Sequence, residues 1–169
     1  MIIISPLETV VEVAAEHPGA FVCGLLGPEM AHPDLPVAET RRLRLTFHDV
    51  SEARDGMEAP DGRHMRELLA FLGQWRAAAE RHPLIVHCWA GISRSPAAAF
   101  IAACMLHPCR VETTLAAQLR ALAPDVTPNI RMVRLADALL ARNGRMEAAV
   151  RAIGRGVETS WGRVRRWNV

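Results

Sequence analysis

The fold of this chain follows from one stretch: Leu84-Ile85-Val86-His87-Cys88-Trp89-Ala90-Gly91-Ile92-Ser93-Arg94-Ser95-Pro96. Its first part, Leu84 to Val86, is a short apolar run bounded by polar and turn-forming residues, which predicts a buried strand. Ser95 is a good N-cap and Pro96 suits the first helical position, so we expect a buried helix over Ala97 to Leu106. The residues between them form a loop that joins a strand end to a helix N-terminus.

A loop in this position is suited to hold a dianion, because backbone N–H groups and the helix dipole both face the ligand. The same groups should stabilise the thiolate of Cys88 and make it a nucleophile at neutral pH. Arg94 offers a planar guanidinium that binds two oxygens of a phosphoryl group. Gly91 lets the backbone turn close to the ligand. Ser95 would place its hydroxyl near the sulfur and help the thiolate leave a phosphocysteine intermediate.

The pattern resembles the signature loop of the protein tyrosine phosphatase superfamily. His87-Cys88, five residues, Arg94 and Ser95 look like its small dual-specificity branch, in a bacterial form, and the flanking strand and helix match as well. The resemblance implies that His87 orders the loop and tunes the thiolate. It also implies a substrate-binding set made of His87, Trp89, Ala90, Gly91, Ile92, Ser93 and Arg94.

The resemblance further implies an aspartate that acts as general acid, on a loop upstream of the cysteine. Asp49 follows a predicted strand and lies 88 − 49 = 39 residues before Cys88. Asp55 is the alternative, since its spacing of 88 − 55 = 33 residues is closer to the usual one. Asp55-Gly56 followed by Pro60 also resembles the acid loop of some small relatives. We favour Asp49 because the strand defines its position.

Elsewhere, strands alternate with helices. Strands are predicted at Ile2 to Ile4, at Phe21 to Leu26 and over 42–47, where apolar and polar residues alternate. Ser5-Pro6-Leu7-Glu8 predicts a capping box for a helix that reaches His17, and Asp61 predicts the cap of the next helix. Three further helices are expected at Val111 to Leu122, Asn129 to Ala141 and Met146 to Ile153.

These elements predict an α/β fold in one domain. We expect a central, mostly parallel sheet of about four to five strands flanked by helices, with a helical C-terminal half. Residues 1–154 form the predicted phosphatase-like domain, and 155–169 form a tail rich in Arg and Trp. In such sheets ligands bind at the carboxyl ends of the strands, where both Asp49 and Cys88 are predicted to lie.

The composition is that of a soluble globular protein, with 50% hydrophobic and 22% charged residues among 169. The net charge is +2, and every basic residue is arginine, which we attribute to a GC-rich coding bias. We therefore expect no nucleic-acid partner. Met1 to Ile4 is too short for a signal segment, and His107-Pro108 interrupts the apolar helix, so we expect a cytoplasmic protein without a membrane partner.

The four cysteines, Cys23, Cys88, Cys104 and Cys109, show no metal-type spacing, so neither a metal nor another cofactor is predicted. The loop interior lacks the added basic residues that inositol-phosphate phosphatases of the resembled superfamily place there. The resemblance therefore implies a phosphorylated protein, with phosphotyrosine first, or a small phosphomonoester as substrate. Two alternatives remain open. One is a phosphate-binding pseudophosphatase, and the other is an enzyme with the same cysteine and arginine pattern but other chemistry, such as a rhodanese-like sulfurtransferase or an arsenate reductase.

Overall fold

A five-stranded sheet runs through the part of the chain that the computed structural model describes, residues 1–79 and 81–169. Four strands are parallel: β1 (Ile2–Pro6), β2 (Phe21–Leu26), β3 (Arg42–Thr46) and β4 (Leu84–Cys88). The antiparallel β5 (Arg165–Trp167) completes the order β3-β2-β4-β1-β5, which places β4 in the middle. The predicted α/β architecture with a mostly parallel sheet is confirmed.

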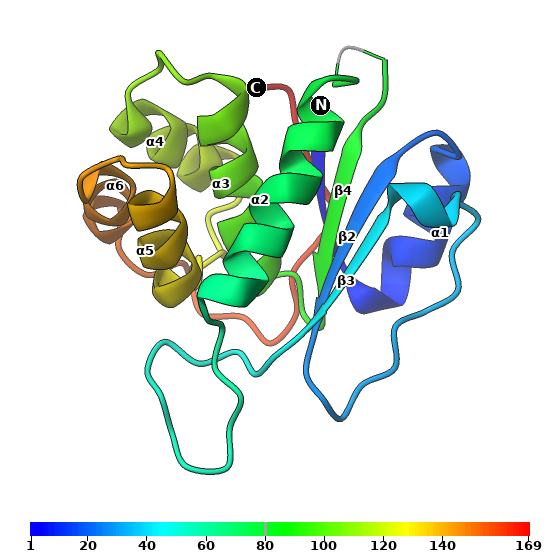
Figure 1. Cartoon of the computed structure of the whole chain (residues 1–169), viewed down its shortest axis with the longest axis horizontal. Helices are drawn as coiled ribbons and strands as arrows, with labels where there is room; N and C mark the ends of the chain where they lie inside the picture. Colours follow the sequence, from blue (N-terminus) through cyan, green and yellow to red (C-terminus); the bar gives the residue numbers. More distant parts are fainter. Residues whose placement is uncertain (80) are drawn as a thin grey trace.

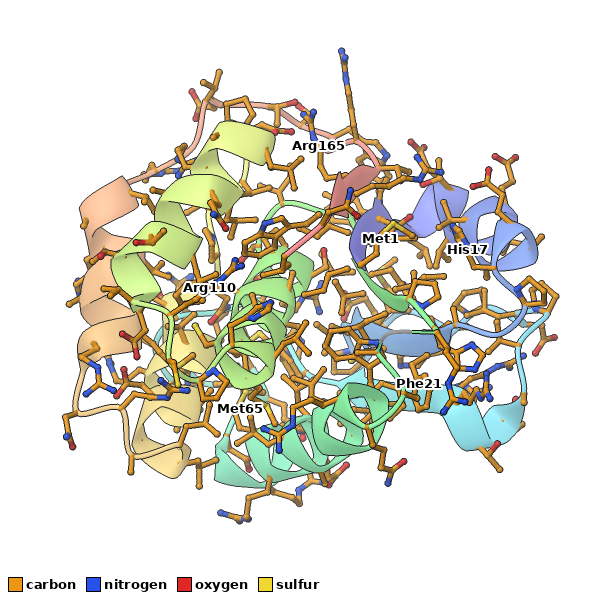
Figure 2. All side chains as sticks on the ribbon, turned by 90° about the horizontal axis from the view of Figure 1, so that it is seen from above. Met1, His17, Phe21, Met65, Arg110 and Arg165 are labelled. Atoms are coloured by element: carbon orange, nitrogen blue, oxygen red, sulfur yellow. The ribbon has the colours of Figure 1, made fainter. Side chains whose placement is uncertain are left out.

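Helices cover both faces of the sheet (Figure 1). A 3-10 turn, Leu7–Thr9, and α1 (Val10–Glu16) lie on one face, where α1 packs against Ile3, Val22 and Ile85. On the other face, α2 (Gly62–Arg76) and α3 (Arg94–Leu106) pack directly on the strands. Outside them lie α4 (Glu112–Leu122), α5 (Ile130–Leu139) and α6 (Arg145–Ile153). Figure 2 shows side chains filling the space between these layers.

The apolar runs explain why β4 and β2 are central. Leu84, Ile85 and Val86 are completely buried, as expected for a parallel strand with helices on both faces. β2 is buried along its whole length, whereas β3 at the edge buries Leu45 but exposes Arg44. This difference follows the sequence, which is continuously apolar in β2 and alternating in β3.

The predicted cap at Asp61 is confirmed, and the structure adds a second cap at Asn129. Asp61 precedes α2 and accepts a hydrogen bond from the backbone N–H of His64, whose ring in turn accepts one from the Asp61 N–H. Asn129 precedes α5, and its side-chain oxygen accepts a hydrogen bond from the N–H of Met132 at 3.1 Å. Both side chains satisfy helix N–H groups that have no partner within the helix.

The predicted capping box at Ser5 is wrong. Ser5 and Pro6 belong to β1, where they pair with His87 and Cys88 of β4. The Ser5 hydroxyl contacts the Thr9 hydroxyl at 3.0 Å and donates to the Pro6 carbonyl, so it caps no helix. Parallel pairing with the central strand extends β1 by two residues and moves the helix start to a 3-10 turn.

The predicted N-cap at Ser95 is also wrong. α3 begins at Arg94, with Ser93 in the cap position, so Pro96 is the third helical residue. Proline is tolerated there, because the first four N–H groups of a helix lack intrahelical acceptors. The earlier helix start turns the side chain of Ser95 toward Cys88.

The segment from α6 to β5, residues 154–164, is called the C-terminal strap here. In Figure 1 it runs from orange to red past the carboxyl ends of the parallel strands before β5 joins the sheet. Trp167 of β5 pairs with Ile2 and is almost completely buried. The predicted tail, 155–169, thus contributes a strand to the sheet. Among the described helices, none combines the length and apolar character that crossing a membrane requires.

Candidate active site

Cys88 is the last residue of β4 and lies below the N-terminus of α3. Its side chain is almost fully buried, with 2% of the residue exposed. Its Sγ lies 3.2 Å from the hydroxyl oxygen of Ser95 in the first turn of α3. Ser95 is itself completely buried, so the two side chains form an enclosed pair. The predicted proximity of Ser95 to the sulfur is therefore present.

Four hydrogen bonds from other segments hold the loop between Cys88 and α3, and three of them reach the carbonyls of residues 89–92. The carbonyl of Trp89 accepts from Leu7 N–H at 2.9 Å, that of Ala90 from Gly162 N–H at 2.9 Å, and that of Ile92 from Thr127 N–H at 2.8 Å. Within the described residues, the N–H groups of the loop donate to no protein acceptor at positions 90–93. The carbonyls thus face the protein while the N–H groups stay available for an anion.

Gly91 makes the sharp turn of this loop possible. Its φ of 74° lies in the left-handed region, which costs a residue with a side chain about 1–2 kcal/mol. A Cβ at this position would also come within 3.0 Å of the backbone nitrogen of Pro6. Conformation and space therefore both require glycine here.

The guanidinium of Arg94 is buried and anchored at one end. Its Nη1 donates to the backbone carbonyl of Phe47 at 2.8 Å, and the residue is only 5% exposed. Its Nε has no hydrogen-bond partner within the described part of the chain. A buried N–H group without a partner is costly, and an anion bound over Cys88 would satisfy it.

Asp49 comes from the segment after β3 and reaches the same place. Its Oδ1 accepts hydrogen bonds from the hydroxyl of Ser93 and from Nδ2 of Asn129, both at 2.8 Å. Its Oδ2 lies 3.7 Å from Nε of Arg94, and about a third of the side chain is exposed. Asp49 is thus held beside the guanidinium and remains accessible to a substrate.

Asn129 is a site residue that the sequence reasoning missed. Its Nδ2 donates to Asp49, while its backbone N–H donates to the carbonyl of Ser93 at 3.1 Å. Asn129 also caps α5, and this local role accounts fully for an asparagine after Thr127-Pro128. No sequence signal points from this helix start to Asp49, because eighty residues separate the two side chains along the chain.

Asp55 lies away from this cluster. It is exposed on a small turn closed by a bridge between Arg54 and Met57, in the loop that projects below the sheet in Figure 1. Among the described contacts, none joins its carboxylate to Cys88 or Arg94. The structure therefore brings Asp49, and not Asp55, to the loop.

His87 lies behind the loop, on the face of the sheet opposite to Cys88. It is 1% exposed, and burial lowers its pKa to about 3, with smaller contributions from His32 and Arg94. A Cβ on Gly24 would lie 2.6 Å from its Nε2, so the glycine of the neighbouring strand provides the space for the ring. His87 is thus neutral and supports the loop from behind.

A hollow of about 290 Å³ opens over the loop. It is lined by Asp49, Cys88, Trp89, Ala90, Ile92, Ser93 and Arg94. Five of the seven predicted substrate-binding residues are in this set, whereas His87 and Gly91 shape the loop from outside it. Trp89 is half exposed at the rim, and its ring meets that of Trp161 edge to face, with centroids 5.4 Å apart.

The fold has solved relatives. Human DUSP28 matches with a TM-score of 0.58 and 19% identity, over 83% of this chain and 94% of its own. A mouse putative dual specificity phosphatase, complexed with zinc tungstate, matches with a TM-score of 0.54 and 19% identity, over 85% of this chain and 80% of its own. Tk-PTP in its active form matches with a TM-score of 0.51 and 15% identity, over 82% of this chain and 88% of its own. No family model and no curated protein sequence matches the chain. The chain therefore has the fold of the dual-specificity phosphatases.

Proposed function

We propose that this protein is a phosphomonoester hydrolase, similar to dual-specificity and tyrosine phosphatases, that works through a phosphocysteine intermediate. One observation carries the proposal: the thiol of Cys88, the guanidinium of Arg94 and the carboxylate of Asp49 line a single hollow above unpaired loop N–H groups. The tungstate complex of the mouse relative supports it, since tungstate is a tetrahedral oxyanion like phosphate.

In the first step, the Cys88 thiolate attacks phosphorus, so that an S–P bond forms as the ester P–O bond breaks. Arg94 and the loop N–H groups bind the oxygens of the transferring group, which is where charge must be stabilised. Asp49 donates its proton to the departing oxygen, as a general acid does for a poor leaving group. The products of this step are the free alcohol or phenol and the phosphocysteine.

In the second step, water attacks the phosphocysteine. The Asp49 carboxylate takes a proton from the water, the S–P bond breaks, and inorganic phosphate leaves. The hydroxyl of Ser95, 3.2 Å from Sγ, donates a hydrogen bond to the sulfur as it becomes a thiolate again. Asp49 is protonated at the end of this step and is ready for the next substrate.

The substrates that we propose are phosphorylated proteins, with phosphotyrosine first, or small phosphomonoesters. Trp89 and Ile92 give the hollow apolar walls, which suit an aryl group above the phosphate. All the reacting groups lie within residues 1–154, so we assign the chemistry to that part of the chain. A catalytic thiol must stay reduced, which fits the cytoplasm.

The test is hydrolysis of p-nitrophenyl phosphate and of a phosphotyrosine peptide by the full chain. We expect turnover that disappears in Cys88→Ser, and mass spectrometry of rapidly acid-quenched enzyme should locate phosphate on Cys88. Thiosulfate and arsenate are assayed in parallel. Binding of the phosphopeptide without turnover would contradict the proposal, and so would sulfur transfer or arsenate reduction as the faster reaction.

A further inference from the structure

Two further hollows lie in a row beside the Cys88 hollow. The near hollow, about 380 Å³, begins at Ile92, which also lines the Cys88 hollow. The far hollow, about 260 Å³, shares Thr127 and Arg155 with the near one. The three hollows therefore border one another through shared lining residues, in a row that starts at the proposed phosphate site, and they are together called the groove.

The C-terminal strap builds one wall of this groove and is firmly attached. The Gly156 N–H donates to the hydroxyl of Thr127 at 3.0 Å, and the Gly154 carbonyl accepts from Arg120 at 2.8 Å. A Cβ on Gly156 would lie 2.5 Å from the backbone of Asp125, so the strap lies against that segment too closely for a larger residue. Arg155 lies between these two anchored glycines, and its backbone is held while its side chain is exposed.

The charge of the groove changes along its length. In the near hollow, Asp125 is paired with Arg165 at 3.1 Å, and Glu158 is exposed at the rim. The far hollow has a floor of Pro128, Ile130 and Val150 and carries Arg151 and Arg155, with no acidic residue in its lining.

The two arginines of the far hollow differ. Arg151 is paired with Glu147 at 2.8 Å. No carboxylate in the described part of the chain lies within ion-pair distance of Arg155. The positive charge of Arg155 is thus available to a ligand in the groove.

We propose that this groove binds the polypeptide of a phosphoprotein substrate next to its phosphorylated residue, and that Arg155 selects an acidic side chain there. This rests on the proposed function, because the groove is defined by the lining residue that it shares with the Cys88 hollow. A small phosphomonoester would occupy the first hollow alone. An apolar floor beside an unpaired cation fits a peptide that carries both apolar and acidic residues.

The experiment compares kcat/KM for sets of phosphotyrosine peptides. Within a set, one position beside the phosphotyrosine is Glu, Ala or Lys, and each flanking position is varied in its own set. At the position that reaches the far hollow, we expect the Glu peptide to exceed the Ala peptide by about 2- to 5-fold through a lower KM, as an exposed ion pair provides. In Arg155→Glu the Lys peptide should become the better substrate. The preference should weaken as salt is raised.

The control is Arg110→Glu, which makes the same charge change at an exposed arginine outside the groove and should keep the preference for Glu. Arg155→Gln, which should abolish the preference, serves as a second variant if Arg155→Glu does not fold. An unchanged preference for Glu in a folded Arg155 variant would overturn the inference while leaving the proposed function intact. If p-nitrophenyl phosphate is not hydrolysed at all, both fall together.

Discussion

Oδ2 of Asp49 lies 3.7 Å from Nε of Arg94, although the two residues belong to different βα units of the sheet. The distance is too long for a hydrogen bond, yet it places the carboxylate directly beside the guanidinium. A phosphoryl group bound by Arg94 would therefore have its leaving oxygen close to Asp49. This relationship leads to the first prediction.

Asp49→Asn should reduce turnover of a phosphotyrosine peptide by about 10²–10⁴-fold and affect p-nitrophenyl phosphate much less. The reason is that p-nitrophenolate departs without a proton, whereas the tyrosine oxygen needs one. The variant should also flatten the alkaline limb of the pH–rate profile, because that limb reports loss of the proton from the acid. Steady-state kinetics with both substrates over a range of pH measure this.

Asp55→Asn is the matched control for this prediction. Its carboxylate is exposed on the projecting loop, so we expect only a small loss that is similar for both leaving groups. The opposite pattern, with Asp55→Asn showing the leaving-group dependence, would transfer the acid role to Asp55.

The second prediction concerns cysteine reactivity. At pH 6, iodoacetate should alkylate Cys88 faster than the exposed Cys109, even though Cys88 is buried. Burial raises the pKa of Cys104 to about 12 and holds that of Cys23 well above the usual range, so these two thiols should stay unmodified. Peptide mass spectrometry after partial labelling gives the alkylation rate of each of the four cysteines.

Phosphate, vanadate or tungstate should protect Cys88 from iodoacetate and leave the rate at Cys109 unchanged. Protection of both cysteines, or labelling of Cys109 first, would show that the loop does not hold an anion over the sulfur.

The third prediction tests the contact between the C-terminal strap and the loop. A Cβ at Gly162 would lie 2.8 Å from the carbonyl oxygen of Ala90 and 3.2 Å from that of Gly91. Gly162→Val should therefore displace the loop and reduce turnover of p-nitrophenyl phosphate by roughly 10- to 100-fold, since small misplacements of catalytic groups are costly. Thermal unfolding checks that the variant still folds.

Gly73→Ala in α2 is the control for Gly162→Val. A Cβ at Gly73 meets nothing within 4 Å, so this change should leave turnover intact and stabilise the helix by about 0.5–1 kcal/mol. Full activity in Gly162→Val would mean that the loop keeps its shape without the strap.

The fourth prediction follows from the buried His87. Its pKa is about 3 in the folded protein, against about 6.5 for an exposed histidine, so only the unfolded state takes up its proton between these values. Stability should therefore fall as the pH is lowered from about 6.5 toward 3, by up to about 1.4 kcal/mol per pH unit from this group.

His87→Gln removes that proton uptake and should show a smaller loss of stability between pH 7 and pH 5 than the unmodified protein. Urea unfolding at several pH values measures the difference. An identical pH dependence in both proteins would mean that His87 is protonated in the folded state or does not contribute.

Local sequence is sufficient to predict β4, the loop and the order of elements around them. A short, continuously apolar run is typical of a strand in a sheet covered on both faces, and this pattern identifies β4 from the residues alone. The same reasoning correctly located Phe21–Leu26 and the cap at Asp61. The predicted helix caps at Ser5 and Ser95 were wrong. Ser5 pairs with β4 instead, and the Ser95 side chain contacts the sulfur of Cys88.

The amino-acid sequence alone predicts that Cys88 and Arg94 flank one loop suited to hold an anion, because both positions are set by a local strand, turn and helix. Which aspartate joins them depends on the tertiary structure, since Asp49 and Asp55 differ little in spacing and both precede the same helix. The tertiary structure also determines that Asn129 holds Asp49 and that the C-terminal strap contacts the loop through Gly162. Such contacts depend on how separate segments pack against one sheet edge, and residue spacing along the chain carries no information about that packing.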